Sequence, residues 1–206
     1  FMAAILLQEG VLHPGERFQC NGELHFYDSV VRCKTGTRLI SHGSLTLEEI
    51  IQYSCNVGII QAMQRIRKDR LYAYMHELGF GERTEFLVGG TEETSGYLPD
   101  LKNWVPSTGF YMPIGQGFSI TPIQLLQAGA SIANGGHLLR PYIADRIVSA
   151  DGKVIFEKKE RSRTNPFRPD VNRAVLRMMR RVVTGGTGRM ADIPNLPVAG
   201  KTGTGQ

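Results

Sequence analysis

Six segments of the chain carry helical signals. Some have apolar residues that recur every three to four positions, and others have capping residues at their ends. These segments are 1–10, 47–53, 56–67, 70–79, 122–134 and 170–184. The first of them is apolar on nearly every face, which is typical of a buried helix. The chain is therefore predicted to be rich in helices, with one helix deep in the core.

Capping residues define most of the helix ends. Thr46 with Glu49, and Thr121 with Gln124, have the spacing of a capping box, in which two polar side chains bond the first backbone N–H groups. Asp69 is expected to cap the helix that Gly79 ends. Gly10 is likewise expected to end the first helix, because glycine adopts the left-handed conformation that closes helices.

Strand signals are shorter. Residues 142–148 and 154–156 alternate around a turn at 151–152, which predicts a β-hairpin. The polar stretch 11–43 contains β-like pieces such as 24–27, whereas 79–117 has few periodic signals and is predicted to be mostly loop. Leu196 to Ala199 lead into a last predicted strand that carries Lys201. Helical blocks with antiparallel strands indicate an α+β fold.

Composition limits the functional classes. The chain has 206 residues, enough for one well-buried core, and a net charge of +5. No run of 18 apolar residues occurs, so the sequence predicts no membrane-spanning helix. The basic run from Arg65 to Arg70 is typical of a solvated helix face, although attraction to an anionic polymer or membrane surface is an alternative. No aromatic residues interleave with this run, so we expect no nucleic-acid partner.

The three cysteines, Cys20, Cys33 and Cys55, lack the spacing of metal ligands. We therefore expect no metal and no cofactor. Cys20 and Cys33 flank a short polar loop and could pair in an oxidising compartment, which the sequence leaves open.

Two groups of polar residues have the chemistry of an acyl-transfer site. Ser54 and Asn56 fall between two predicted helices, and Lys201-Thr202-Gly203-Thr204 lies close to the end of the chain. A lysine beside a hydroxyl favours loss of the hydroxyl proton and attracts a substrate carboxylate. Threonine hydroxyls add donors, and glycine lets a substrate lie close to the backbone. The serine can relay a proton, and the carboxamide can both donate to and accept from a substrate amide.

Two observations weigh against these motifs taken alone. Ser54 and Asn56 could simply cap a helix, with Lys201 on the surface. The same letters also occur as Lys34-Thr35-Gly36-Thr37. We interpret this earlier copy as a coincidence, because it precedes Ser54 and no apolar strand leads into it.

Seven pieces in order make the chain resemble one family over its whole length, 1–206. They are Ser54-Cys55-Asn56, Leu78-Gly79-Phe80-Gly81, Gly115-Gln116-Gly117, Thr121-Pro122-Ile123-Gln124, Ala133-Asn134-Gly135-Gly136, Gly186-Thr187-Gly188 and Ala199-Gly200-Lys201-Thr202-Gly203-Thr204. This order resembles the transpeptidase domain of class B high-molecular-weight penicillin-binding proteins. The resemblance implies the penicillin-binding protein/serine β-lactamase-like fold, in which an antiparallel sheet is flanked by helices and a helical lobe.

The resemblance also implies a function, namely crosslinking of peptidoglycan stem peptides by serine acyl transfer, with β-lactams as mimics of the substrate. By this resemblance Ser54 protonates the leaving group, Asn56 holds the acyl side and Lys201 tunes Ser54. Thr202 and Thr204 would bind the terminal carboxylate, beside Gly203. Cell-wall synthesis proteins would be partners, at the periplasmic or extracytoplasmic face of the membrane.

One part of the family pattern is missing: no serine in the chain is followed three residues later by a lysine. We therefore expect 1–206 to be a partial domain, with the nucleophile segment before residue 1 and the closing strands after residue 206. On this expectation Phe1 should approach Ser54 and Lys201, and these residues alone should not be acylated. The alternatives are a non-catalytic penicillin-binding or sensor module of the same fold and, with less support, a serine β-lactamase.

Overall fold

The computed structural model describes residues 1–35, 37–86, 93–158 and 162–203. The helices are α1 (Met2–Glu9), α2 (Leu47–Gln52), α3 (Asn56–Met63), α4 (Lys68–Glu77), α5 (Pro106–Tyr111), α6 (Pro122–Ala133) and α7 (Pro169–Gly185). Short 3-10 turns cover Leu101–Asn103, Met112–Ile114 and Arg189–Ala191. The helical segments predicted from the sequence are thus all present, and α5 is an addition inside the predicted loop 79–117.

The strands form antiparallel pairs. They are β1 (Arg17–Cys20), β2 (Glu23–Phe26), β3 (Ser29–Arg32), β4 (Lys34–Thr35), β5 (Arg38–Leu39), β6 (Gly43–Thr46), β7 (His137–Leu139), β8 (Arg146–Val148), β9 (Val154–Glu157) and β10 (Ser162–Thr164). The pairs are β1–β6, β2–β3, β4–β5, β7–β10 and β8–β9. The α+β class and the hairpin at 151–152 are confirmed, but within the described residues each sheet holds only two strands.

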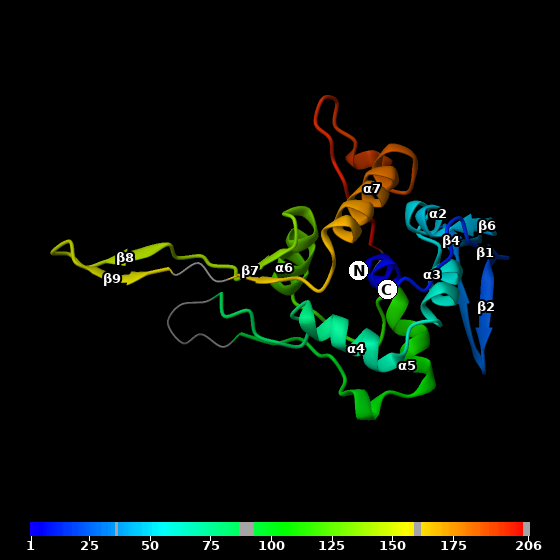
Figure 1. The fold of residues 1–206 in the computed structure, drawn as a ribbon, viewed down its shortest axis with the longest axis horizontal. Helices are drawn as coiled ribbons and strands as arrows, with labels where there is room; N and C mark the ends of the chain where they lie inside the picture. Colours follow the sequence, from blue (N-terminus) through cyan, green and yellow to red (C-terminus); the bar gives the residue numbers. More distant parts are fainter. Residues whose placement is uncertain (36, 87–92, 159–161, 204–206) are drawn as a thin grey trace.

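Helix α1 lies at the centre of the molecule, between α7 and α3 (Figure 1). Ala3, Ala4, Ile5 and Leu6 are buried, as the apolar pattern of this segment predicts. Gly10 ends the helix in the left-handed conformation, with φ 65°, and its N–H bonds the carbonyl of Leu6. The core therefore forms around a short helix that has little polar surface of its own.

Polar residues fix the last turn of α1 to its neighbours. The hydroxyl of Tyr74 in α4 donates to Glu9 over 2.6 Å, and Arg70 Nη2 donates to the same carboxylate oxygen over 2.7 Å. From the other side, the N–H of Arg168 donates to Gln8 Oε1 over 2.9 Å. Distant segments thus hold α1 by its C-terminal end.

The arginines of the basic run make ion pairs. The pairs are Arg65 with Glu16, Arg67 with Asp69 and Arg70 with Glu9. Such ion pairs are typical of a solvated helix face, which is the interpretation that the sequence favoured over attraction to an anionic surface.

The helix ends follow the sequence signals with two exceptions. The first is α3, which ends at Met63 rather than at the predicted Arg67. Both capping boxes form, at Thr46 with Glu49 and at Thr121 with Gln124. The predicted cap at Asp69 is wrong. Arg67 occupies the N-cap position, and Asp69 lies inside the first turn, where it pairs with Arg67.

The buried side chain of Gln124 organises the long connection between α4 and α6. Its Nε2 donates to the carbonyls of Glu82 over 2.7 Å and Ser95 over 2.8 Å. Tyr97 and Ser119 exchange two backbone hydrogen bonds. The described parts of the predicted loop, 79–86 and 93–117, therefore share a buried polar anchor. Beyond α6, the hairpin β8–β9 extends away from the body (Figure 1).

The segment before Lys201 packs on α7 rather than pairing with another strand. Gly200 N–H donates to the carbonyl of Met179 over 3.2 Å, and Arg180 Nη1 donates to the carbonyl of Val198 over 2.8 Å. The predicted strand at Lys201 is therefore wrong for the described residues 197–203. The reason is that a strand needs a neighbour to complete its ladder, and here the helix takes up these backbone and side-chain bonds.

Within the described ranges, no helix combines the length and the apolar character that are needed to cross a bilayer.

Candidate functional site

Ser54 lies in the break between two consecutive helices, as predicted. Helix α2 ends at Gln52 and α3 begins at Asn56. The N-cap of α3 is Cys55, whose Sγ accepts from the N–H of Gly58 over 3.2 Å. Ser54 itself is exposed and adopts the left-handed conformation, with φ 55°. Because Cys55 performs the capping, the alternative in which Ser54 merely caps a helix is wrong.

Lys201 joins Ser54 across 147 residues of sequence. Its Nζ donates to Ser54 Oγ over 2.7 Å and to the carbonyl of Thr202 over 2.9 Å. Burial of the amino group lowers the pKa of Lys201. A partly desolvated ammonium beside a hydroxyl stabilises negative charge on the oxygen, which is the chemistry expected of an acid–base pair.

Thr202 is tied to a turn after α7. Its hydroxyl lies 2.7 Å from that of Thr187. The N–H of Thr187 donates to the carbonyl of Gln52 over 3.2 Å, and Gln52 Nε2 donates to the carbonyl of Gly185 over 3.1 Å. The residues just before Ser54 therefore also hold the turn that contacts Thr202.

Gly186 allows this close approach. A Cβ atom at this position would lie 2.2 Å from the carbonyl oxygen of Gln52. Only a residue without a side chain lets the end of α7 lie so near the end of α2.

The other predicted residues are placed as follows. Asn56 is half-buried, and its Nδ2 donates to the carbonyl of Arg32 at the end of β3 over 3.1 Å. This bond ties Asn56 to the β-region, which we define as strands β1 to β6, rather than to Lys201. Gly203 is exposed beside Thr202, whereas Thr204 lies outside the described residues.

The start of α1 lies near the same site. The backbone nitrogen of Phe1 is buried and lies within the electrostatic range of the Lys201 charge. This agrees with the expected approach of Phe1 to Lys201, while the expected approach to Ser54 stays a prediction. The start of α1, the end of α2 and the segment after α7 therefore meet at one place.

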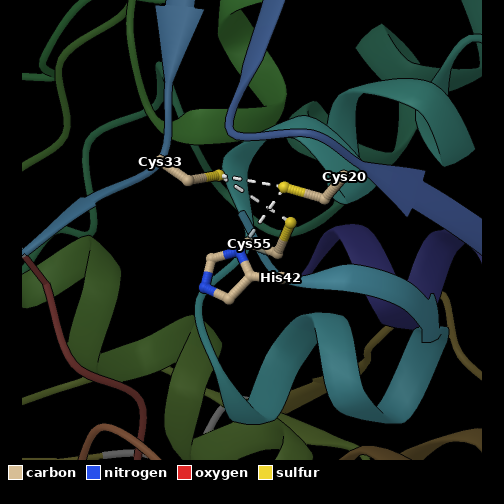
Figure 2. Close-up of side chains that lie close together, drawn as sticks. All are labelled: Cys20, Cys33, His42 and Cys55. Carbon is tan, nitrogen blue, oxygen red and sulfur yellow. Dashed lines mark hydrogen bonds between the residues drawn. The ribbon is translucent and has the colours of Figure 1, made fainter. Parts of the chain in front are cut away.

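A second cluster of polar side chains includes Cys55, the residue that follows Ser54 in the sequence. Figure 2 shows Cys20, Cys33, Cys55 and His42 converging, with their ligand atoms all within 4.8 Å of one another. The three cysteines are free and buried, so the suggested Cys20–Cys33 disulfide is not formed. A hydrogen bond from Cys55 lowers the pKa of Cys33 to about 5, and the same contact raises the pKa of Cys55.

The sequence reasoning missed two features of this region. Thr187 was noticed only as part of a family-like piece, because its role depends on a contact with Thr202. The cysteine cluster was missed because ligand spacing along the chain was the only criterion. The four residues come from different elements, so only folding brings them together.

Comparison with known proteins places these features in a family. The family model described as the penicillin binding protein transpeptidase domain matches residues 1–206. The penicillin-binding protein PbpB of Mycolicibacterium smegmatis is 32% identical over 213 residues, which cover 99% of this chain and 32% of that protein. Stage V sporulation protein D of Bacillus subtilis is also 32% identical, over 100% of this chain and 31% of its own length. The chain therefore spans about a third of the length of these relatives.

Solved structures agree with this assignment. The crystal structure of penicillin-binding protein 3 from Mycobacterium tuberculosis in complex with ampicillin has a TM-score of 0.86 and 30% identity, over 100% of this chain and 46% of that chain. The D,D-transpeptidase domain of a peptidoglycan glycosyltransferase from Eggerthella lenta has a TM-score of 0.82 at 23% identity, over 100% of this chain and 52% of that chain. The latter shows a shared fold.

Proposed function

Because the chain belongs to the penicillin-binding protein transpeptidase family, we propose that the protein is a D,D-transpeptidase that crosslinks peptidoglycan stem peptides. The reaction would cleave a D-Ala-D-Ala bond by attack of a serine, release D-Ala and pass the acyl group to an amine. One observation carries the proposal for this chain, namely the 2.7 Å contact of Lys201 Nζ with Ser54 Oγ.

Ser54 acts as the proton donor to the leaving amine. Its Oγ already accepts a hydrogen bond from Lys201, so its own proton is free to be transferred. The positive charge of Lys201 stabilises the oxygen that has lost this proton, and a lysine with a lowered pKa can then restore it.

Asn56 and the residues after Lys201 hold the substrate. Because Asn56 Nδ2 is engaged with the carbonyl of Arg32, its Oδ1 is the atom that accepts the substrate N–H. Thr202 and Thr204 bind the terminal carboxylate, and Gly203 leaves room for the substrate backbone. The contact of Thr202 with Thr187 supports this role, because it fixes the orientation of the Thr202 hydroxyl.

The attacking serine is contributed from outside residues 1–206. This part of the proposal is supported by the lack of any serine followed three residues later by lysine. β-Lactams would acylate the same serine. The protein would act at the extracytoplasmic face of the membrane, together with cell-wall synthesis proteins.

Covalent labelling with a fluorescent penicillin tests the proposal on the protein at its full native length. We expect one adduct on a serine outside 1–206, located by peptide mass spectrometry. Ser54→Ala and Lys201→Ala should each lower the acylation rate constant by about 10² to 10⁴-fold, the usual contribution of a positioned acid or base.

Matched controls lie on the hairpin β8–β9, which extends away from the site (Figure 1). Ser149→Ala and Lys153→Ala remove the same side-chain types there and should label at the wild-type rate. An adduct on Ser54 itself, or full-rate labelling of Lys201→Ala, would contradict the proposed roles.

A further inference from the structure

Three thiols and one imidazole meet in the interior of the β-region, beside the candidate site (Figure 2). Cys20 is the last residue of β1, and Cys33 links β3 to β4. His42 directly precedes β6, and Cys55 is the N-cap of α3. From this arrangement we propose that Cys20, Cys33, His42 and Cys55 form a structural zinc site.

Three of the distances between ligand atoms match those around a tetrahedral zinc ion. Zn–S bonds of about 2.3 Å and a Zn–N bond of about 2.0–2.1 Å place sulfurs about 3.8 Å apart and sulfur and nitrogen about 3.5 Å apart. In the structure the Sγ atoms of Cys20 and Cys33 are 3.8 Å apart, and those of Cys33 and Cys55 are 3.8 Å apart. Cys20 Sγ lies 3.5 Å from His42 Nδ1. These three separations are thus those of a zinc tetrahedron, and the remaining ligand atoms lie within 4.8 Å of one another.

Zinc accounts for all four residues, whereas a disulfide accounts for two. A disulfide between any two of the three cysteines would leave the third thiol and the His42 imidazole unexplained. Three cysteines with one histidine are a common ligand set of closed structural zinc sites. Binding would release the thiol protons to solvent and place three thiolates and a neutral imidazole around the ion.

The surroundings suit thiolate ligands. Cys55 Sγ accepts from the backbone N–H of Gly58 over 3.2 Å, in the first turn of α3. Such N–H bonds and the positive end of a helix stabilise negative charge on sulfur. The ring of His42 is stacked on that of Tyr53, at 6.4 Å between centroids, which holds the imidazole in place.

The β-region also needs a link of this kind. Between Cys20 and His42 the described chain forms two short hairpins, β2–β3 and β4–β5, in which the buried apolar side chains are those of Val31 and Cys33. Two-stranded hairpins are only marginally stable by themselves. A metal that joins both ends and the middle of this segment to α3 would hold it on the core.

The metal would also fix the residues proposed to act on the substrate, because Cys55 lies between Ser54 and Asn56. This consequence rests on the proposed function, but the zinc site itself does not. A zinc-containing protein that penicillin fails to acylate would refute the proposed function and leave the metal site intact.

The test is the metal content of the protein at its full native length, purified without chelators and measured by inductively coupled plasma mass spectrometry. We expect about one zinc per chain bound by these four residues. Cys33→Ser and His42→Ala should lose most of this zinc, while His25→Ala, at an exposed histidine on β2, should keep it. Intact mass and thiol titration of the denatured protein should show three free thiols among these cysteines.

Cobalt substitution gives a readout that does not depend on how the variants fold. After removal of zinc with a chelator, Co²⁺ should produce the intense thiolate charge-transfer and tetrahedral d–d absorption of such a site. Protein without zinc would overturn the proposal, whether it contains free thiols or a Cys20–Cys33 disulfide. Zinc that is retained in both Cys33→Ser and His42→Ala would also overturn it.

Discussion

Replacing Gly186 with alanine should disturb the contact between the ends of α2 and α7. A Cβ atom there would lie 2.2 Å from the carbonyl oxygen of Gln52 and 2.9 Å from both Cα and O of Val182. All three atoms belong to the backbone, so no side-chain rotation relieves the overlap. The backbone of Gly186 has φ −115°, which alanine can adopt, so the expected cost is steric.

The size of the loss in stability follows from the atoms around Gly186. Overpacking a well-packed site costs about 1–3 kcal/mol, and the rigid backbone partners favour the upper end. For a domain of this size, about 3 kcal/mol corresponds to a fall in Tm of about 6–12 °C. The hydrogen bond from Thr187 N–H to Gln52 should also be lost, which would slow acylation by penicillin.

Differential scanning calorimetry of the protein at its full native length measures this change. Gly129→Ala is the matched control, because this glycine lies inside α6 with no atom within 4 Å of an added Cβ. It should raise stability by about 0.5–1 kcal/mol through helix propensity. If Gly186→Ala melted at or above the wild-type temperature, the steric argument would fail.

Three further predictions concern other polar contacts. The hydrogen bond from Arg70 holds the pKa of Glu9 below its usual value of about 4.3. The pair therefore stabilises the fold fully at pH values above the usual pKa, and this stabilisation is lost as the pH falls through the lowered pKa of the folded state. Arg70→Met should therefore lower stability at neutral pH more than at acidic pH, as urea titrations at both would show. Gln124→Leu should lower the free energy of unfolding by about 2–3 kcal/mol in the same urea titration, because two backbone carbonyls lose a buried donor. Thr187→Val should slow penicillin acylation about tenfold with an unchanged Tm, since it removes the hydroxyl that contacts Thr202 and keeps the volume; wild-type acylation would exclude a positioning role.

The sequence determined the local structure well where the signals are local. The capping boxes at Thr46 and Thr121, the glycine that ends α1 and the apolar face of that helix depend on neighbouring residues, and all are confirmed. The family was also predicted from the sequence, because several short pieces occur in a fixed order, and it is confirmed.

Local reasoning failed where an element depends on distant partners. Lys201 was predicted on a strand, but strand formation depends on a neighbouring strand, and in the described residues this segment contacts α7 instead. α5 was missed because its few apolar positions give little periodicity, and it is held by packing of the buried Phe110.

The chemistry of the site divides in the same way. Residue types alone identified Ser54 and Lys201 as a hydroxyl and a cation suited to proton transfer. Only the tertiary structure brought them to 2.7 Å across 147 residues and gathered three cysteines and His42 into one cluster. The physical reason is that side-chain chemistry belongs to each residue, whereas the distance between two side chains is set by the packing of everything between them.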